Sequence, residues 1–151
     1  MKWDEFFIKM ADFVAQKSKD RVTKIGVVIV GPHNEVRSIG YNGFPRGVDD
    51  DIAGRHLRPS KYLWTEHAER NAIYNAARMG TSLQGCTIYT VAPCSDCARA
   101  IIQSGIAKVV ARPFPQGEGK ADWTQNIAVG LTMLKEAGVK FVLYEEEDGS
   151  N

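Results

Sequence analysis

The stretch CTIYTVAPCSDC (residues 86–97) places a predicted strand directly before a predicted helix. Residues 86–91 are rich in β-branched and aromatic side chains, which is typical of a short strand. Pro93 suits the entry to a helix, where a missing N–H costs no hydrogen bond. Ser104 and Gly105 mark the end of that helix, and the apolar run 106–111 predicts another strand. Together these segments predict a β-α-β unit.

Hydrophobic periodicity extends this alternation in both directions. Apolar residues at intervals of three and four predict helices, and short β-branched runs predict strands. The expected helices are 3–17, 66–78 and 126–137, and the other strands are 24–30, 35–41 and 139–144. An opening hairpin followed by β-α-β alternation implies an α/β fold with a mixed five-stranded sheet and helices on both faces, in three layers α-β-α. Residues 40–60, rich in glycine at their start, are expected to form an ordered functional loop.

Length and composition limit the classes of protein that fit. The chain has 151 residues and a formal net charge of +1, so we expect one domain, 1–151, with a frayed tail at 145–151. The balanced charge gives no support to a nucleic-acid partner. No apolar run approaches the roughly 20 residues of a membrane span, and the start does not resemble a signal peptide. We therefore expect a cytoplasmic protein with no membrane contact.

Three residues with soft or borderline ligand atoms lie at predicted strand-to-helix junctions, where ligands gather in α/β sheets. Cys94 and Cys97 are three apart, so they share one face of a first helical turn, and the positive end of the helix favours their thiolate forms. The imidazole of His67 adds a nitrogen ligand. Two sulfurs and one nitrogen suit zinc, and three protein ligands leave a fourth position for water, as in catalytic sites.

Glu69 lies two residues after His67. On a regular helix this offset would point the two side chains apart. They converge only if His67 sits at or just before the start of the helix. A carboxylate beside a zinc-bound water serves as general base and then as general acid. We therefore predict that Glu69 is the catalytic acid/base.

Two other interpretations of the cysteines stay open at this point. A C-x-x-C pair alone also fits a thioredoxin-like dithiol, although here it falls late in the chain and follows an H-x-E. A closed structural zinc site would need a fourth ligand from Cys86, His33 or His56, and none of these has paired spacing. Cys86 is expected to be a small buried apolar residue.

Three motifs together resemble the deoxycytidylate (dCMP) deaminase family of the zinc deaminase superfamily. They are GYNGFPRG (40–47), HAERNAI (67–73) and PCSDCA (93–98). The resemblance runs from about Lys2 to Tyr144. It implies a cytidine deaminase-like fold, a single catalytic zinc ion, and hydrolytic deamination of dCMP to dUMP with release of ammonia, which supplies thymidylate synthesis. It also implies a homo-oligomer, either a dimer or a hexamer.

The resemblance further implies roles for individual residues. Glu69 would carry a proton from the water to cytosine N3 and then to the departing amine. Asn42 would contact the sugar, and Asn71 would brace its loop or touch the sugar. The remaining candidates are the backbone at Ala68, Ala92 and Pro93 for the pyrimidine edge, Arg21, Thr23 and Lys24 for the phosphate, and Trp123, which either closes over the nucleotide or packs in the core.

Several alternative functions remain within the same chemistry. The substrate could be a modified dCMP, a tRNA adenosine or a pyrimidine of the riboflavin pathway. The 19 basic and 18 acidic residues leave little room for the basic face that RNA needs. A catalytically idle, zinc-stabilised binding module is the non-enzymatic alternative, but such a module has no use for an acid/base carboxylate at Glu69.

Overall fold

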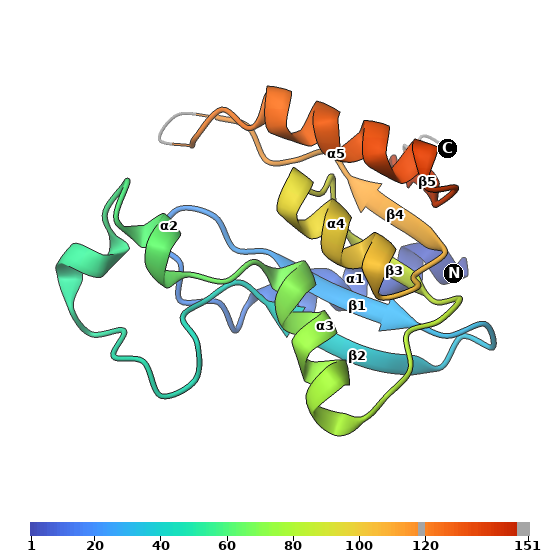
Figure 1. The fold of residues 1–151 in the computed structure, drawn as a ribbon, viewed down its shortest axis with the longest axis horizontal. Helices are drawn as coiled ribbons and strands as arrows, with labels where there is room; N and C mark the ends of the chain where they lie inside the picture. The colour runs from blue at the N-terminus through green and yellow to red at the C-terminus, as the bar shows by residue number, and fades with distance from the viewer. Residues whose placement is uncertain (118–119, 148–151) are drawn as a thin grey trace.

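A computed structural model describes residues 1–117 and 120–147 and contains one mixed five-stranded sheet. The strand order is β2-β1-β3-β4-β5 (Figure 1). The strands are β1 Gly26–Val30, β2 Val36–Tyr41, β3 Thr87–Val91, β4 Lys108–Arg112 and β5 Lys140–Leu143. Strand β1 pairs antiparallel with both β2 and β3, while β3, β4 and β5 run parallel. The predicted hairpin and β-α-β alternation are therefore confirmed.

Helices cover both faces of the sheet, which confirms the three-layer α-β-α prediction. The longer helices are α1 Trp3–Ala15, α3 Ala68–Met79, α4 Ser95–Gln103 and α5 Thr124–Glu136. Helix α1 packs on one face, where Phe7 and Ile8 meet Val28 and Val110. Helices α3, α4 and α5 lie over the other face, and α3 and α4 lie side by side with their first turns close together (Figure 1). Cys86 is fully buried in the core on this second face, as expected.

The structure differs from the sequence-based prediction mainly between residues 40 and 65. The long loop contains a 3₁₀ turn, η1 Ala53–His56, and a single helical turn, α2 Lys61–Trp64. Neither was predicted, because one turn is too short to show a hydrophobic period. Tertiary contacts hold α2 in place, since the ammonium of Lys61 lies 3.3 Å from the carboxylate of Asp20. Phe44 stacks on His56, with ring centroids 4.9 Å apart, so the loop packs partly on itself.

The end of the chain can be described only in part. The expected frayed tail includes residues 148–151, which lie outside the described residues. Residues 145–147 carry no helix or strand, yet Glu146 lies 3.2 Å from Arg112 and Glu147 lies 2.5 Å from Lys2. Across the part of the chain that the structure describes, none of the helices has the length and apolar character to cross a membrane.

Candidate active site

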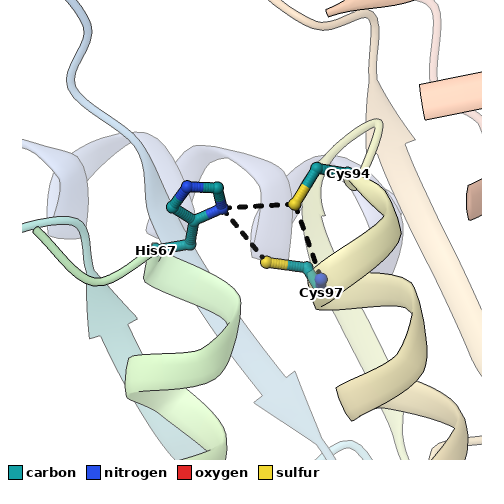
Figure 2. Close-up of side chains that lie close together, drawn as sticks. All are labelled: His67, Cys94 and Cys97. Carbon is teal, nitrogen blue, oxygen red and sulfur yellow. Dashed lines mark hydrogen bonds between the residues drawn. The ribbon is translucent and has the colours of Figure 1, made fainter. Parts of the chain in front are cut away.

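His67, Cys94 and Cys97 converge where the first turns of α3 and α4 meet (Figure 2). His67 is the N-cap residue of α3, with extended backbone angles, and Cys94 is the N-cap residue of α4. Nδ1 of His67 lies 3.3 Å from Sγ of Cys94 and 3.4 Å from Sγ of Cys97. The ligand atoms of all three residues lie within 4.8 Å of one another.

This geometry fits a tetrahedral zinc ion. With Zn–S near 2.3 Å and Zn–N near 2.05 Å, two ligands of a tetrahedron are about 3.6 Å apart. The two observed nitrogen–sulfur separations are close to that value. Both thiols are buried, and the histidine is only partly buried. Three protein ligands on one side leave the other side for a water or a substrate atom.

The surroundings of the two thiols shift their pKa values in opposite directions. Hydrogen bonding from Cys97 and from the His67 ring outweighs burial and lowers the pKa of Cys94 to about 4. The contact with Cys94 raises the pKa of Cys97, and burial and the nearby Glu69 carboxylate raise it further. The same contact with Cys94 raises the pKa of His67. Cys94 is therefore the more acidic of the two thiols, and zinc binding needs both in the deprotonated form.

Glu69 lies in the first turn of α3 and faces the same point as the ligands. Only 3% of its surface is exposed. Its Oε2 lies 3.4 Å from Sγ of Cys97, and its Oε1 accepts a 2.6 Å hydrogen bond from the hydroxyl of Thr90. Because His67 precedes the helix rather than lying within it, an offset of two residues brings both side chains to one place, as the spacing required.

Helix α5 packs against the backbone of Pro93 and Cys94. Gly130 packs so closely that a Cβ atom there would lie 3.0 Å from the Pro93 carbonyl oxygen and 3.3 Å from the Cys94 carbonyl oxygen. One turn earlier, Oδ1 of Asn126 accepts a 2.7 Å hydrogen bond from the amide of Ser95. The backbone that carries Cys94 is therefore held by a helix that follows it by about thirty residues.

A cleft opens beside the ligands and contains some of the predicted substrate contacts. Asn42, Thr23, Ala68, Ala92 and Trp123 line it together with His67, Glu69 and Cys94. Trp123 places its ring edge-on to the His67 ring, with centroids 5.8 Å apart, so it lies against the cleft rather than in the core.

Four other candidates lie outside the lining of this cleft. Arg21 and Lys24 are exposed and Pro93 is fully buried, and none of the three is among the residues that line the cleft. Asn71 donates a 2.8 Å hydrogen bond to the Tyr41 carbonyl oxygen, so its side chain braces the glycine-rich loop. These four remain predictions as substrate contacts, without support from the geometry.

Three cations that line the cleft were not predicted as substrate contacts from the sequence. They are Arg58, Lys61 and Lys120. Nζ of Lys120 donates to Oγ1 of Thr23 at 3.0 Å and to the Val22 carbonyl oxygen at 3.1 Å, which closes one side. No sequence pattern distinguishes these residues from solvated surface charges, and Lys120 lies about sixty residues after the other two in the chain.

The side-chain amide of Asn42 holds the backbone of two residues that line the cleft. Its Oδ1 accepts the Ile25 N–H and its Nδ2 donates to the Thr23 carbonyl oxygen, both at 2.9 Å. Gly43 exchanges two backbone hydrogen bonds with Glu66, at 3.1 and 2.8 Å. The glycine-rich loop is thereby fixed to the residue that precedes His67, and one amide hydrogen and one oxygen lone pair of Asn42 remain for a ligand.

Asp20 and Lys61, which both line the cleft, form an ion pair. Both side chains are about one-tenth exposed. Burial alone would raise the pKa of Asp20, but hydrogen bonds from the Thr23 and Val22 amides and the nearby Lys61 ammonium together lower it. A group with a lowered pKa in the folded state stabilises the fold above its unfolded pKa, and this stabilisation is lost as pH falls through the folded value.

Replacing Asp20 by asparagine is expected to lower the free energy of unfolding by about 1–3 kcal/mol near neutral pH, because Lys61 stays buried without a counter-charge. Urea unfolding of the zinc-loaded protein measures this difference. The gap between wild type and variant should stay constant down to about pH 4, the unfolded carboxyl value, and shrink below it. Asp51→Asn, at an exposed position, is the control. A gap that widens in acid would contradict this account.

Comparison with known proteins identifies the family. The family model described as "Cytidine and deoxycytidylate deaminase zinc-binding region" matches residues 1–112. The chain belongs to this deaminase family. Zinc is accordingly the metal that His67, Cys94 and Cys97 fit.

Individual members of the deaminase family resemble much of the chain. An "Uncharacterized deaminase in luxG 3'region" of Aliivibrio fischeri is 44% identical and covers 92% of this chain and 91% of its own length. The deoxycytidylate deaminase of Homo sapiens is 39% identical over 73% of this chain, which spans 64% of that protein. The crystal structure of dCMP deaminase from the cyanophage S-TIM5, in complex with dCMP and dUMP, is 26% identical. It has a TM-score of 0.76 and covers 95% of this chain and 99% of its own.

Proposed function

We propose that the protein catalyses the hydrolytic deamination of dCMP to dUMP, with release of ammonia. The observation that carries the proposal is the position of Glu69, buried beside three zinc-type ligands in a cleft that three cations also line. A nucleoside monophosphate has the matching distribution of groups, with a base at one end and a dianionic phosphate at the other. The names of the human relative and of the cyanophage structure support the same substrate.

Each residue of the site has a separate role in the proposed deamination. When bound, zinc supplies a water whose pKa is lowered to about 7. Glu69 takes a proton from that water and delivers it to N3 of the cytosine while the water oxygen bonds to C4. Glu69 then takes the second proton of that oxygen and gives it to the amine at C4, so that the C4–N bond breaks, ammonia leaves and a C4 carbonyl remains. The Ala68 and Ala92 backbone lies along the cleft wall, where fixed N–H and C=O groups can recognise the pyrimidine edge. The Trp123 ring covers the His67 side and excludes water.

The sugar and phosphate lie toward the mouth in this proposal. The unused hydrogen and lone pair of Asn42 face the sugar hydroxyl. The phosphate is placed beside Arg58 and Lys120, which both line the cleft. Lys61 is already paired with Asp20, so its charge is partly neutralised. The phosphate-binding cations are thus proposed to come from the segments around 58 and 120 rather than from Arg21 or Lys24.

Replacing Lys120 by alanine is expected to raise KM for dCMP by about 10- to 100-fold with a smaller change in kcat, because one charge-assisted hydrogen bond to the phosphate is lost. Steady-state kinetics by ultraviolet absorbance measures the effect. Lys24→Ala is the matched control, since Lys24 is exposed and lies outside the cleft lining. A large rise in KM for Lys24→Ala together with none for Lys120→Ala would reverse the assignment.

A substrate panel tests the proposed activity directly. The purified, zinc-loaded protein should turn over dCMP in preference to CMP, deoxycytidine, dCTP and an RNA anticodon stem-loop, with metal content measured in parallel. A modified dCMP and the riboflavin-pathway pyrimidine belong in the same panel. Faster turnover of any of these than of dCMP would overturn the substrate assignment. Absence of turnover on the whole panel would favour the idle binding module.

The same proposal includes a single domain, a cytoplasmic location and a homo-oligomer, either a dimer or a hexamer. These features rest on the resemblance to the deaminase family. Light scattering coupled to size-exclusion chromatography would report the mass of the particle, and a monomer would remove the oligomer from the proposal.

A further inference from the structure

We propose that Thr90 is a positioning residue for the acid/base Glu69, an inference that rests on the proposed deaminase function. Thr90 lies on β3 and Glu69 on α3, and each side chain is about 3% exposed. The Thr90 hydroxyl donates to Oε1 of Glu69 at 2.6 Å. The short contact joins strand β3 to helix α3.

The contact holds one carboxylate oxygen and leaves the other directed toward the zinc ligands. The terminal torsion of a glutamate is broad, so a buried carboxylate without a fixed partner samples several orientations. Thr90 fixes Oε1, and Oε2 is then directed toward Cys97 and the zinc ligands. The β-branched side chain of threonine has restricted rotamers, so its hydroxyl is itself held in place.

The hydroxyl also suits a carboxylate that gains and loses a proton. It donates to Oε1 when Glu69 is ionised, and it can still donate to Oε1 when the proton resides on Oε2. The proton transferred in the reaction is therefore confined to the oxygen that faces the water and the base. A proton held on Oε2 has a short distance to travel in each transfer step. Small displacements of a catalytic group lower the rate of such steps substantially.

Thr90 acts through Glu69 rather than on the nucleotide. It does not belong to the lining of the cleft, and within residues 1–117 and 120–147 its hydroxyl makes no other hydrogen bond. It also lies outside the group of zinc ligands. A change at Thr90 should consequently affect the chemical step while substrate affinity and metal content stay constant.

The variant Thr90→Val removes the hydroxyl and keeps the shape of the side chain. We expect kcat for dCMP to fall by about 10- to 100-fold, from the loss of a hydrogen bond to an ionised group, with KM and zinc content unchanged. Thr90→Ser restores a hydroxyl and should recover most of the rate. Thr87→Val, the same substitution on the same strand, is the control. A Thr90→Val enzyme with normal kcat would overturn the inference.

A double-mutant cycle separates positioning from a general structural effect. In a Glu69→Gln background, Thr90→Val should have almost no additional effect on the residual rate, because the proton-carrying group is already absent. Fully additive losses would overturn the inference.

Failure of the Thr90 inference can be distinguished from failure of the proposed deaminase function. A wild-type protein inactive on dCMP overturns the proposed function alone. The Thr90 inference is then decided by crystal structures of zinc-loaded wild type and Thr90→Val. A rotated Glu69 carboxylate in the variant supports it, and an unchanged carboxylate overturns it.

Discussion

Glu69→Gln is expected to lower kcat for dCMP by about two to four orders of magnitude while the zinc stays bound. Glutamine has the shape of glutamate, so it can fill the same buried space and still accept the hydrogen bond from Thr90. It cannot take a proton from water or return one to the amine. The loss therefore falls on proton transfer, which is the only role that requires a carboxylate at this position.

Measurement of kcat, KM and zinc content on the same preparations tests this expectation. The ligand set of His67, Cys94 and Cys97 is unchanged in the variant, so full metal occupancy is part of the predicted result. Glu136→Gln, at an exposed position on α5, controls for the substitution itself. Near-normal rates in Glu69→Gln would remove Glu69 from the mechanism, and loss of zinc would show that its role is to support the metal.

His67→Ala is expected to abolish stable zinc binding and, with it, activity. Only Cys94 and Cys97 then remain as ligands, and two thiolates cannot enclose a tetrahedral ion alone. Loss of a direct ligand should weaken zinc affinity by more than the roughly 100-fold that follows loss of an outer contact. Because zinc binds the folded chain, the variant should also unfold at a lower temperature in the presence of zinc.

Competition with a chromogenic chelator reports the zinc affinity of the His67→Ala variant. His33→Ala is the matched control, because His33 lies in the turn between β1 and β2, away from the metal group. The control should retain its ion under conditions that strip His67→Ala. A His67→Ala protein that keeps its zinc against the chelator would exclude His67 from the ligand set.

The ligands and the fold could be predicted from the sequence because both depend on short-range spacing. The interval between Cys94 and Cys97 places both thiols on one helical turn, and the interval between His67 and Glu69 requires a helix start. Apolar runs determine which segments become strands, and the right-handed β-α-β rule then leaves few arrangements of the sheet. The observed N-cap positions of His67 and Cys94 agree with that reasoning.

The supports of the site could not be predicted because they depend on contacts between distant segments. Lys120 meets Thr23 across nearly a hundred residues, and in sequence it is one lysine in a loop. Thr90 has the composition of any strand residue, and only the packing of α3 on the sheet reveals its partner. Gly130 lies inside helix α5, where a glycine is locally unfavourable. The structure explains this glycine, because α5 approaches the Pro93 backbone too closely there for a side chain.

The close packing of α5 on the cysteine loop has a consequence for the order of events during synthesis. The ribosome produces His67, Cys94 and Cys97 before it produces α5, which begins at Thr124. A nascent chain that ends earlier carries every ligand but lacks the backbone that presses on the Pro93–Cys94 peptide. Domains fold largely as units. The native packing around the Pro93–Cys94 peptide is therefore complete only after α5 has been synthesised.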